Sequence, residues 1–396
     1  MLKTAARAAS SSLPPARKTD GIAVIWIDWY PYHVARFEGL LAHPDLEGRV
    51  SGIELVGGIG VHAGLKFREE LPSALPIETL FPQNSWGEVK GWKAARALWR
   101  RLNRLDPAVV LVPGYYTAPG LAAALWGKLK RRRTVLMTES TESDHPRTSA
   151  KESVKSLLVR GLFDWAIAGG APHRRYLERL GFPKERIARF YDVVDNTFFR
   201  ERARALRKHA LPSDFDLPER YFLYVGRLAE EKNVRGLLGA YFEYRRSGGN
   251  WALVLVGDGP ERKTLEEMAT ASRYGAGVRF AGLRSASELP EFYAFAGCFV
   301  LPSTREPWGL VANEAMAAAL PLIVSRRCGC AEDLLAEGEN GCSFDPDLPG
   351  DLTACLTAVA GLEADSLADM GRRSEEIVAR FSPAAWASEV ARIARS

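Results

Sequence analysis

Short apolar runs alternate with amphipathic segments along most of the chain. GIAVIWI, from residue 21, is a β-rich apolar run, and in the following DWYPYHVARFEGLL the residues Val34, Phe37, Leu40 and Leu41 fall on one helical face. The same order of strand, loop and helix returns in AVVLVPGYYTAPGLAAAL and in YFLYVGRLAEEKNVRGLLGAYFEY. Continuous apolar runs are typical of strands in a parallel sheet that is covered on both faces. The pattern therefore predicts an α/β fold with doubly wound parallel sheets.

The length of 396 residues, of which 47% are apolar, is more than one ordinary hydrophobic core supports, so we expect two domains. The first would span residues 21–200 and the second residues 219–396. Residues 201–218 are charged and punctuated by prolines, which predicts a linker. Residues 1–20 are mostly Ala, Ser, Arg and Pro, which predicts a disordered tail, although a transit peptide has a similar composition. No run approaches the roughly 18 apolar residues of a membrane helix.

One strand-to-helix junction combines two carboxylates with a helix start. The run Cys298–Leu301 predicts a buried strand, and a helix is expected to begin near Gly309 and to end before Pro321. Glu306 precedes this helix and Glu314 lies one turn inside it. The amino end of a helix attracts anions, and ligands bind at the carboxyl ends of parallel strands. The alternative is that both glutamates are solvated surface residues.

A second junction places two cations after a predicted strand. YFLYV runs into Gly226 and Arg227, and Lys232 follows a short acidic spacer. Arginine offers a forked donor and lysine a compact charge, a combination that suits a diphosphate. Gly257 and Gly282 end two further predicted strands.

These motifs resemble one enzyme family, the retaining GT-B glycosyltransferases of family 4 (glycosyl transferases group 1). EPWGLVANEAMA resembles the family's signature of two glutamates eight positions apart, and Gly226 to Asn233 matches its G-R-L-x-x-x-K-N pattern. The resemblance implies two Rossmann-like domains that face a cleft, with the last helix crossing back to the first domain. It implies that Glu306 contacts hydroxyls of the donor sugar, that Glu314 holds the ribose, and that Arg227 and Lys232 neutralise the diphosphate. The other donor-binding residues that it implies are Gly226, Gly257, Gly282, Gly309, Leu310 and Val311.

The resemblance also implies a reaction. A sugar would pass with retention from a UDP- or GDP-sugar to a hydroxyl of a glycan or of a lipid-linked acceptor, in cell-surface polysaccharide or glycolipid synthesis. Fixed cations and helix amides would stabilise the leaving diphosphate, so neither a cofactor nor a metal ion is expected. Asp214 and Asp216 imitate a metal-binding D-x-D motif, but they lie among prolines and not at the end of a strand.

The acceptor side is expected in the first domain. The loop after the first strand carries Tyr32 and His33, which could stack on or hydrogen-bond to an acceptor, with aromatic packing as the alternative. By its position after a strand, Glu139 is the residue that best matches the family's group near the reacting sugar, and Asp144 is second. The alternative for several residues of this loop is that they cap the next helix.

Basic residues concentrate in one stretch of the first domain. Residues 88–133 contain eleven Lys and Arg against two acids, and Lys93, Arg96, Arg100 and Arg104 recur on one helical face. This predicts contact between residues 90–133 and an anionic membrane surface, with a solvated helix face as the alternative. Nucleic acid is not expected as a partner, because 53 basic and 48 acidic residues nearly cancel over the whole chain.

The five cysteines all lie in the second half, which fits reduced thiols in a cytoplasmic protein, with a possible peripheral position on the cytoplasmic face of the membrane. Two other functions stay open. Gly58, Gly60 and Ala63 follow the spacing of a dinucleotide fingerprint, which would make the protein an NAD(P)-dependent oxidoreductase. A non-catalytic scaffold that binds a nucleotide sugar would keep the same fold.

Overall fold

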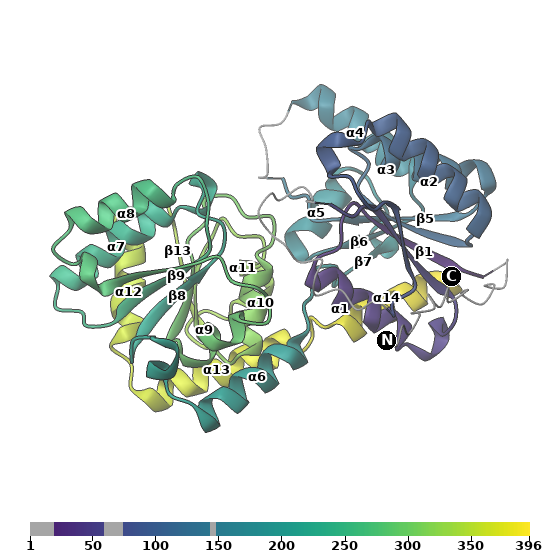
Figure 1. The fold of residues 1–396 in the computed structure, drawn as a ribbon. Helices are drawn as coiled ribbons and strands as arrows, with labels where there is room; N and C mark the ends of the chain where they lie inside the picture. Colours follow the sequence, from purple (N-terminus) through teal and green to yellow (C-terminus); the bar gives the residue numbers. More distant parts are fainter. Residues whose placement is uncertain (1–19, 59–73, 143–147) are drawn as a thin grey trace, which may run out of the picture.

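Two α/β domains make up the computed structural model, which describes residues 20–58, 74–142 and 148–396 (Figure 1). Each domain is built on one sheet whose strands are all parallel. This confirms the predicted fold class of two Rossmann-like, doubly wound domains. The tail predicted for residues 1–20 lies almost entirely outside the described residues.

The first domain has the strand order β3-β2-β1-β4-β5-β6-β7. Its strands are β1 (Ile22–Trp26), β2 (Val50–Val56), β3 (Ile77–Phe81), β4 (Val109–Pro113), β5 (Arg133–Thr138), β6 (Trp165–Ala168) and β7 (Ile187–Ala188). Its α-helices are α1 (Pro31–Leu41), α2 (Gly91–Leu105), α3 (Ala118–Lys130), α4 (Ser149–Leu162) and α5 (Ala171–Arg179).

The second domain has the strand order β10-β9-β8-β11-β12-β13. Its strands are β8 (Tyr221–Val225), β9 (Ala252–Val256), β10 (Val278–Gly282), β11 (Cys298–Leu301), β12 (Leu322–Ser325) and β13 (Gly341–Phe344). The α-helices of the second half are α6 (Asn196–His209), α7 (Val234–Arg246), α8 (Arg262–Ala271), α9 (Leu289–Phe295), α10 (Leu310–Ala317), α11 (Ala331–Leu334), α12 (Asp351–Ala360), α13 (Ala364–Val378) and α14 (Pro383–Arg395).

Helices cover both faces of each sheet, which explains why the central strands are apolar throughout. All five residues of β1 and all five of β8 are buried. In the first domain α2, α3 and α4 lie on one face and α1 and α14 on the other (Figure 1). In the second domain α7, α8 and α12 share one apolar cluster with the sheet, while α9, α10 and α13 pack on the opposite face.

The last helix joins the two domains. α14 begins after Ser382, whose hydroxyl accepts a hydrogen bond from the amide of Ala385 at 3.2 Å, and it packs against α1 of the first domain (Figure 1). Trp386 is fully buried there, with its ring centroid 6.1 Å from that of Trp26. The last helix thus packs against the first domain.

The segment predicted as a linker is partly helical. α6 continues to His209, with Asp195 as its N-cap, and it packs against α9 and α10 of the second domain. Most charged residues of α6 are exposed, whereas Phe199 and Ala203 are buried and the Arg207 guanidinium donates to the carbonyls of Ala294 and Ala318. Only the stretch after His209 resembles a linker.

The sheet of the first domain ends in a very short strand, β7, which pairs with β6 at the sheet edge. β7 has only two residues, and both are buried. A two-residue strand leaves no apolar run for periodicity to detect. The helix that carries Lys93, Arg96, Arg100 and Arg104 begins at Gly91, after a 3-10 turn at residues 86–88.

None of the helices in the described residues is long and apolar enough to cross a membrane.

The close contact between α1 and α14 generates a stability prediction. A Cβ on Gly39 would lie 2.7 Å from the carbonyl oxygen of Pro383, whereas a Cβ on Gly161 in α4 would meet nothing within 4 Å. Gly39→Ala should therefore lower the free energy of unfolding by about 1–3 kcal/mol through overpacking. Gly161→Ala is the matched control and should raise stability by up to about 1 kcal/mol through helix propensity. Calorimetric unfolding of both variants measures the difference; equal effects would contradict this account of the interface.

Candidate active site

The order of the strands in the second sheet reverses beside β8. The chain runs from β8 outward through β9 to β10, and then returns to β11 on the other side of β8. In open parallel sheets ligands bind outside the carboxyl ends of the strands at such a reversal. The loops after β8 and β11 are therefore the expected position of a ligand, and they carry Arg227 and Glu306.

Lys232 and Glu306 meet at this point. Lys232 ends a 3-10 turn, η6 (Glu230–Lys232), and its Nζ forms an ion pair with Glu306 Oε2. The Ser303 hydroxyl donates to the same oxygen at 3.2 Å. The Lys232 and Glu306 side chains are 21% and 10% exposed, so the pair is largely screened from water. The structure thus brings together two predicted residues that are 74 positions apart; their roles in catalysis remain predictions.

Arg227 leaves the end of β8 and stays half exposed. Its guanidinium pairs with Glu231 one helical turn later, and its backbone carbonyl accepts a hydrogen bond from the Tyr224 hydroxyl at 2.8 Å. Arg227 supplies a forked cation and Lys232 an ammonium at this edge of the sheet, and each is paired with a glutamate. Those charges suit a ligand with two phosphates.

The amino end of α10 faces the same region. Gly309 is its N-cap, with a left-handed φ of 103°, and a Cβ there would lie 2.7 Å from Leu301 Cδ2. No acidic side chain lies in the first turn and no side chain caps it. The amides of Leu310 and Val311 therefore form a helix start with a positive dipole end and no built-in anion.

Glu314 lies one turn into α10, in an apolar setting. Its Oε2 accepts a hydrogen bond from the hydroxyl of Tyr293, which is fully buried in α9, at 2.8 Å. Burial raises the pKa of Glu314 to about 7, although the Tyr293 hydrogen bond acts in the opposite direction. Glu306 and Glu314 consequently differ in environment: the first is paired with a cation, and the second has only a neutral partner.

The three glycines predicted at the donor site end neighbouring strands. The amide of Gly226 donates to Val256 O at 3.0 Å, and that of Gly257 donates to Gly282 O at 2.8 Å. Gly257 has a φ of 135°, and a Cβ there would lie 1.9 Å from Gly226 O. Close packing of the strand ends thus explains the need for glycine at position 257, and a contact of these glycines with a donor remains a prediction.

On the first domain, the predicted acceptor residue Tyr32 lies near Glu139. Burial raises the pKa of Tyr32 well above its usual value, and the nearby charge of Glu139 raises it further. His33 also serves the fold, because its Nδ1 accepts the amide of Tyr30 at 3.3 Å and its ring stacks on Trp26 at 4.5 Å. Burial, followed by the charge of Arg36, lowers the pKa of His33 well below its usual value. Asp144 lies outside the described residues.

A buried ion pair that was not predicted from the sequence lies at this edge. Arg36 of α1 and Asp192, which follows β7, are both fully buried and lie 3.4 Å apart. Burial raises the pKa of Asp192 well above its usual value, the charge of Glu139 raises it further, and Arg36 lowers it. The Arg36 guanidinium also lies over the Tyr191 ring at 4.3 Å. An arginine on the apolar face of the first helix was the signal in the sequence, since an unpaired arginine is rarely buried.

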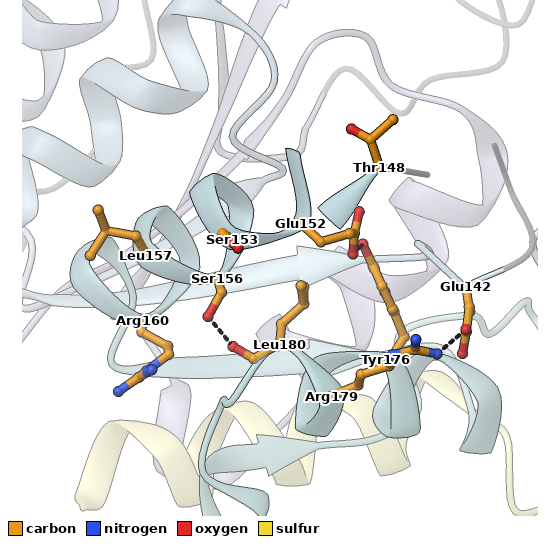
Figure 2. A pocket seen from close by; sticks show the side chains of 10 residues that line it. All are labelled: Glu142, Thr148, Glu152, Ser153, Ser156, Leu157, Arg160, Tyr176, Arg179 and Leu180. Carbon is orange, nitrogen blue, oxygen red and sulfur yellow. Dashed lines mark hydrogen bonds and ion pairs between the residues drawn. The ribbon is translucent and has the colours of Figure 1, made fainter. Parts of the chain in front are cut away.

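Figure 2 shows a separate hollow, between α4 and α5, with a volume of about 670 Å³. It contains none of the residues predicted for the donor or the acceptor. Its polar side chains are largely paired with one another or with backbone: Arg179 with Glu142, the Tyr176 hydroxyl with Glu152 at 2.8 Å, and the Ser156 hydroxyl with Leu180 O at 2.6 Å. We therefore place the site at the strand ends.

The first glycine of the dinucleotide fingerprint has a structural explanation. The amide of Gly58 donates to Asn84 O at 3.0 Å, and a Cβ there would lie 2.8 Å from the Asn84 backbone. Gly60 and Ala63, which complete the dinucleotide fingerprint, lie outside the described residues. Within the described ranges, no group of three or more His, Cys, Asp or Glu is arranged to hold a metal ion.

Comparison with known proteins supports the reading of the second domain. Residues 208–376 match the family described as Glycosyl transferases group 1. This match covers Arg227, Lys232, Glu306 and Glu314.

Curated relatives show the same regional likeness. The chain is similar to the sulfoquinovosyl transferase SQD2 of Arabidopsis thaliana, with 29% identity over 187 residues, which are 47% of this chain and 34% of that protein. It is also similar to alpha-monoglucosyldiacylglycerol synthase of Acholeplasma laidlawii, with 31% identity over 123 residues, which are 31% of each chain. The chain thus spans about a third of the length of the curated relatives it matches.

Solved structures resemble the whole chain. HepE of Anabaena, in complex with UDP and glucose, superposes with a TM-score of 0.73 at 18% identity and covers 95% of this chain and 99% of its own. Sucrose-phosphate synthase from Thermosynechococcus elongatus has a TM-score of 0.70 at 18% identity, with coverage of 95% and 98%. At these identities the likeness establishes the fold, which is that of two-domain GT-B glycosyltransferases.

The unusual environment of Glu314 predicts a pH effect. Its pKa is about 7 in the folded protein and lower in the unfolded chain, so the unfolded chain loses this proton first as the pH rises. This residue therefore lowers stability progressively from about pH 4.5 to pH 7, and the loss is complete above that range. Glu314→Gln keeps an acceptor for Tyr293 but cannot ionise. Relative to the wild type, the variant should gain about 1–3 kcal/mol of unfolding free energy between pH 4.5 and pH 8. Denaturant unfolding across this range measures the gain, and a difference that does not change with pH would contradict the raised pKa.

Proposed function

We propose that this protein is a retaining glycosyltransferase that moves a sugar from a nucleoside-diphosphate sugar to an acceptor hydroxyl. The observation that carries the proposal is the meeting of Arg227, the Lys232–Glu306 pair and the uncapped start of α10 at the strand reversal of the second domain. Two cations and a helix start are suited to a diphosphate, and two glutamates in different environments are suited to sugar hydroxyls.

In the proposed reaction the bond between the sugar C1 and the phosphate oxygen breaks, and the electron pair leaves with the diphosphate. Arg227, Lys232 and the α10 amides stabilise the charge that develops on the leaving group. The acceptor oxygen forms its bond to C1 on the same face, and its proton passes to the departing phosphate. Glu306 is held by Lys232 and Ser303, which supports a role in accepting hydrogen bonds from the sugar and not one as a nucleophile. Glu314 would accept hydrogen bonds from the ribose.

The donor and acceptor classes follow from the relatives. The HepE structure contains UDP and glucose, and another relative is named as a GDP-mannose-dependent alpha-mannosyltransferase of Corynebacterium glutamicum. UDP- and GDP-sugars are therefore the donors to test first. One relative is a synthase of alpha-monoglucosyldiacylglycerol, and one structural neighbour is a lipopolysaccharide outer core galactosyltransferase. We propose a glycan or lipid-linked acceptor, in cell-surface polysaccharide or glycolipid synthesis.

The first test removes the proposed phosphate contacts. Arg227→Ala and Lys232→Ala should each lower turnover by about 100- to 1,000-fold, because each removes a charge that acts as the diphosphate leaves. Transfer or hydrolysis of UDP-glucose and GDP-mannose is the measurement. Arg246→Ala is the matched control, since Arg246 is also an exposed arginine paired with a glutamate on a neighbouring turn, but it ends α7 away from the strand reversal. Normal turnover in both test variants would contradict the assignment of Arg227 and Lys232 to the active site.

The same assay separates the competing functions. Turnover should survive excess chelator, because fixed cations supply the neutralisation; loss on EDTA with recovery on manganese would contradict a metal-independent reaction. UDP- or GDP-sugars should raise the unfolding temperature and NAD(H) should not. Protection by NAD(H) alone would favour the oxidoreductase, and nucleotide-sugar binding without turnover would favour the scaffold.

A second proposal concerns a membrane surface. α2 and α3 contain no acidic residue, and their outer side exposes Trp92, Leu125 and Leu129, with 59%, 46% and 73% of each residue accessible. Exposed basic residues surround these side chains, and none of them forms an ion pair with a described residue. They are Lys90, Lys93, Arg96, Arg100, Arg104, Lys130 and Arg131. We propose that this basic–apolar face rests on the anionic cytoplasmic side of a membrane, where the charges are attracted and the apolar tips enter the interface.

Vesicle binding tests this surface. Arg96→Glu combined with Arg100→Glu should weaken binding to phosphatidylglycerol-containing vesicles by at least about 2 kcal/mol, at about 1 kcal/mol per basic residue. The same charge reversal at Arg372 on α13, a 66% exposed side chain in the second domain, is the control. Co-sedimentation at low and high salt provides the readout, because screening should weaken specific attraction. Equal binding to neutral and anionic vesicles would contradict the proposal.

A further inference from the structure

The first domain touches the second beside the proposed donor site. The start of α5 is the contact point: the amide of Ala171 donates to Asp333 Oδ2 at 2.6 Å, and Arg175 forms an ion pair with Glu332. Arg189, which follows β7, pairs with the other oxygen of Asp333. Asp333 and Glu332 belong to α11, so this corner of the first domain is fixed to the second by charge.

His173 extends this contact to the loop that carries Glu306. Its side chain is fully buried, its Nδ1 lies 3.1 Å from the amide of Gly170, and its Nε2 lies 2.9 Å from Pro307 O. The Gly170 amide can only donate, so Nδ1 must be the unprotonated nitrogen. Nε2 then carries the proton and donates it to the Pro307 carbonyl, which can only accept. The geometry therefore fixes one neutral tautomer, and that tautomer bridges the two domains.

The surroundings leave little room for this loop to shift. A Cβ on Gly329 would lie 1.8 Å from Pro307 O, and one on Gly170 would lie 2.5 Å from Trp308 Cζ3. Trp308 is buried, and its indole NH donates to Asn313 Oδ1 at 2.8 Å. Asn313 in turn donates to the carbonyl of Asp192, in the first domain, at 3.3 Å. Pro307 and Asn313, which both follow Glu306 in the chain, are thus each held by a residue of the first domain.

We propose that His173 is a positioning residue, which holds the Pro307 carbonyl and thereby sets the place of Glu306 against the donor sugar. This inference rests on the proposed function, and it adds that the acceptor-side domain orients the sugar-contacting carboxylate. His173 would not touch the substrate. A displacement of about 1 Å in a positioned group can lower a rate by about a hundredfold, so one hydrogen bond on the neighbouring residue is enough to matter.

Two substitutions separate the two hydrogen bonds of His173, one with Gly170 and one with Pro307. Asn at this position carries an acceptor near the place of Nδ1, so His173→Asn retains the bond from Gly170 that caps α5 but is too short to reach Pro307. Gln carries an acceptor and a donor on a longer side chain, so His173→Gln can serve both partners. We expect His173→Asn to lower kcat for UDP-glucose or GDP-mannose about tenfold, which corresponds to about 1.4 kcal/mol, with the Kd for the free nucleoside diphosphate within about twofold of wild type. His173→Gln should restore kcat to within about threefold of wild type.

A readout independent of activity completes the test. Hydrogen exchange of the backbone amides between residues 306 and 312 should be faster in His173→Asn than in wild type and near wild type in His173→Gln, while exchange in the first-domain sheet stays unchanged. Arg174→Ala is the control, since Arg174 neighbours His173 on α5 and pairs with Glu178 within the same helix. Unchanged exchange or unchanged kcat in His173→Asn would overturn the proposal. An equal loss of nucleotide affinity and of kcat in His173→Asn would also overturn the proposal, because such a loss indicates damage to the whole site and not a shift of Glu306 alone. A wild-type protein that turns over no nucleotide sugar would instead refute the proposed function, and the exchange data would still decide whether His173 holds the loop.

Discussion

The ion pair between Lys232 and Glu306 joins the two halves of the second domain at the point where its strand order reverses. Lys232 follows the strand from which the chain runs in one direction, and Glu306 follows the strand from which it runs in the other. Because the pair is largely screened from water, neither charge could remain there alone without a considerable desolvation penalty. Each partner therefore fixes the other. A phosphate that approaches Lys232 and a sugar hydroxyl that approaches Glu306 would meet groups already held in place, which lowers the cost of ordering them on binding.

The two glutamates of the site show how one motif can supply two kinds of carboxylate. Glu306 has a cation and a hydroxyl as partners, so its negative charge is stabilised in place. Glu314 has only the Tyr293 hydroxyl, and its pKa of about 7 means that a ligand must compete with neutralisation by a proton. A ribose with two adjacent hydroxyls would offer the ionised form two donors and so favour it. Binding of the nucleotide would then depend on pH through Glu314.

Much of the fold and of the second-domain site could be predicted because the signals are local. The run Cys298–Leu301 is a strand with those bounds, and the following helix begins at Leu310, as the spacing of apolar residues and the Gly309 turn indicate. Glu306 and Glu314 lie in one stretch of sequence, so their common location needed no knowledge of tertiary structure. β7, in contrast, has two residues and produces no periodicity. The helical part of the expected linker was hidden because charged residues dominate its composition.

The contacts that no local pattern could reveal are those between distant segments. Arg36 and Asp192 are 156 positions apart, and His173 and Pro307 are 134 apart. Arg36 stands out on its own helix, but its segment does not reveal Asp192 as the partner. Likewise, nothing in the segments of His173 and Pro307 predicts their hydrogen bond. Both contacts converge on the strand ends of the first domain. There the Asp192 carboxylate and the His173 ring both lie against Gly169. The proposed acceptor-side edge is therefore assembled by long-range electrostatics and hydrogen bonds, whereas the proposed donor-side edge is encoded largely within single strand-to-helix turns. Substitutions in the distant segments should accordingly change how the two sides are placed relative to each other without removing any group from the donor site itself.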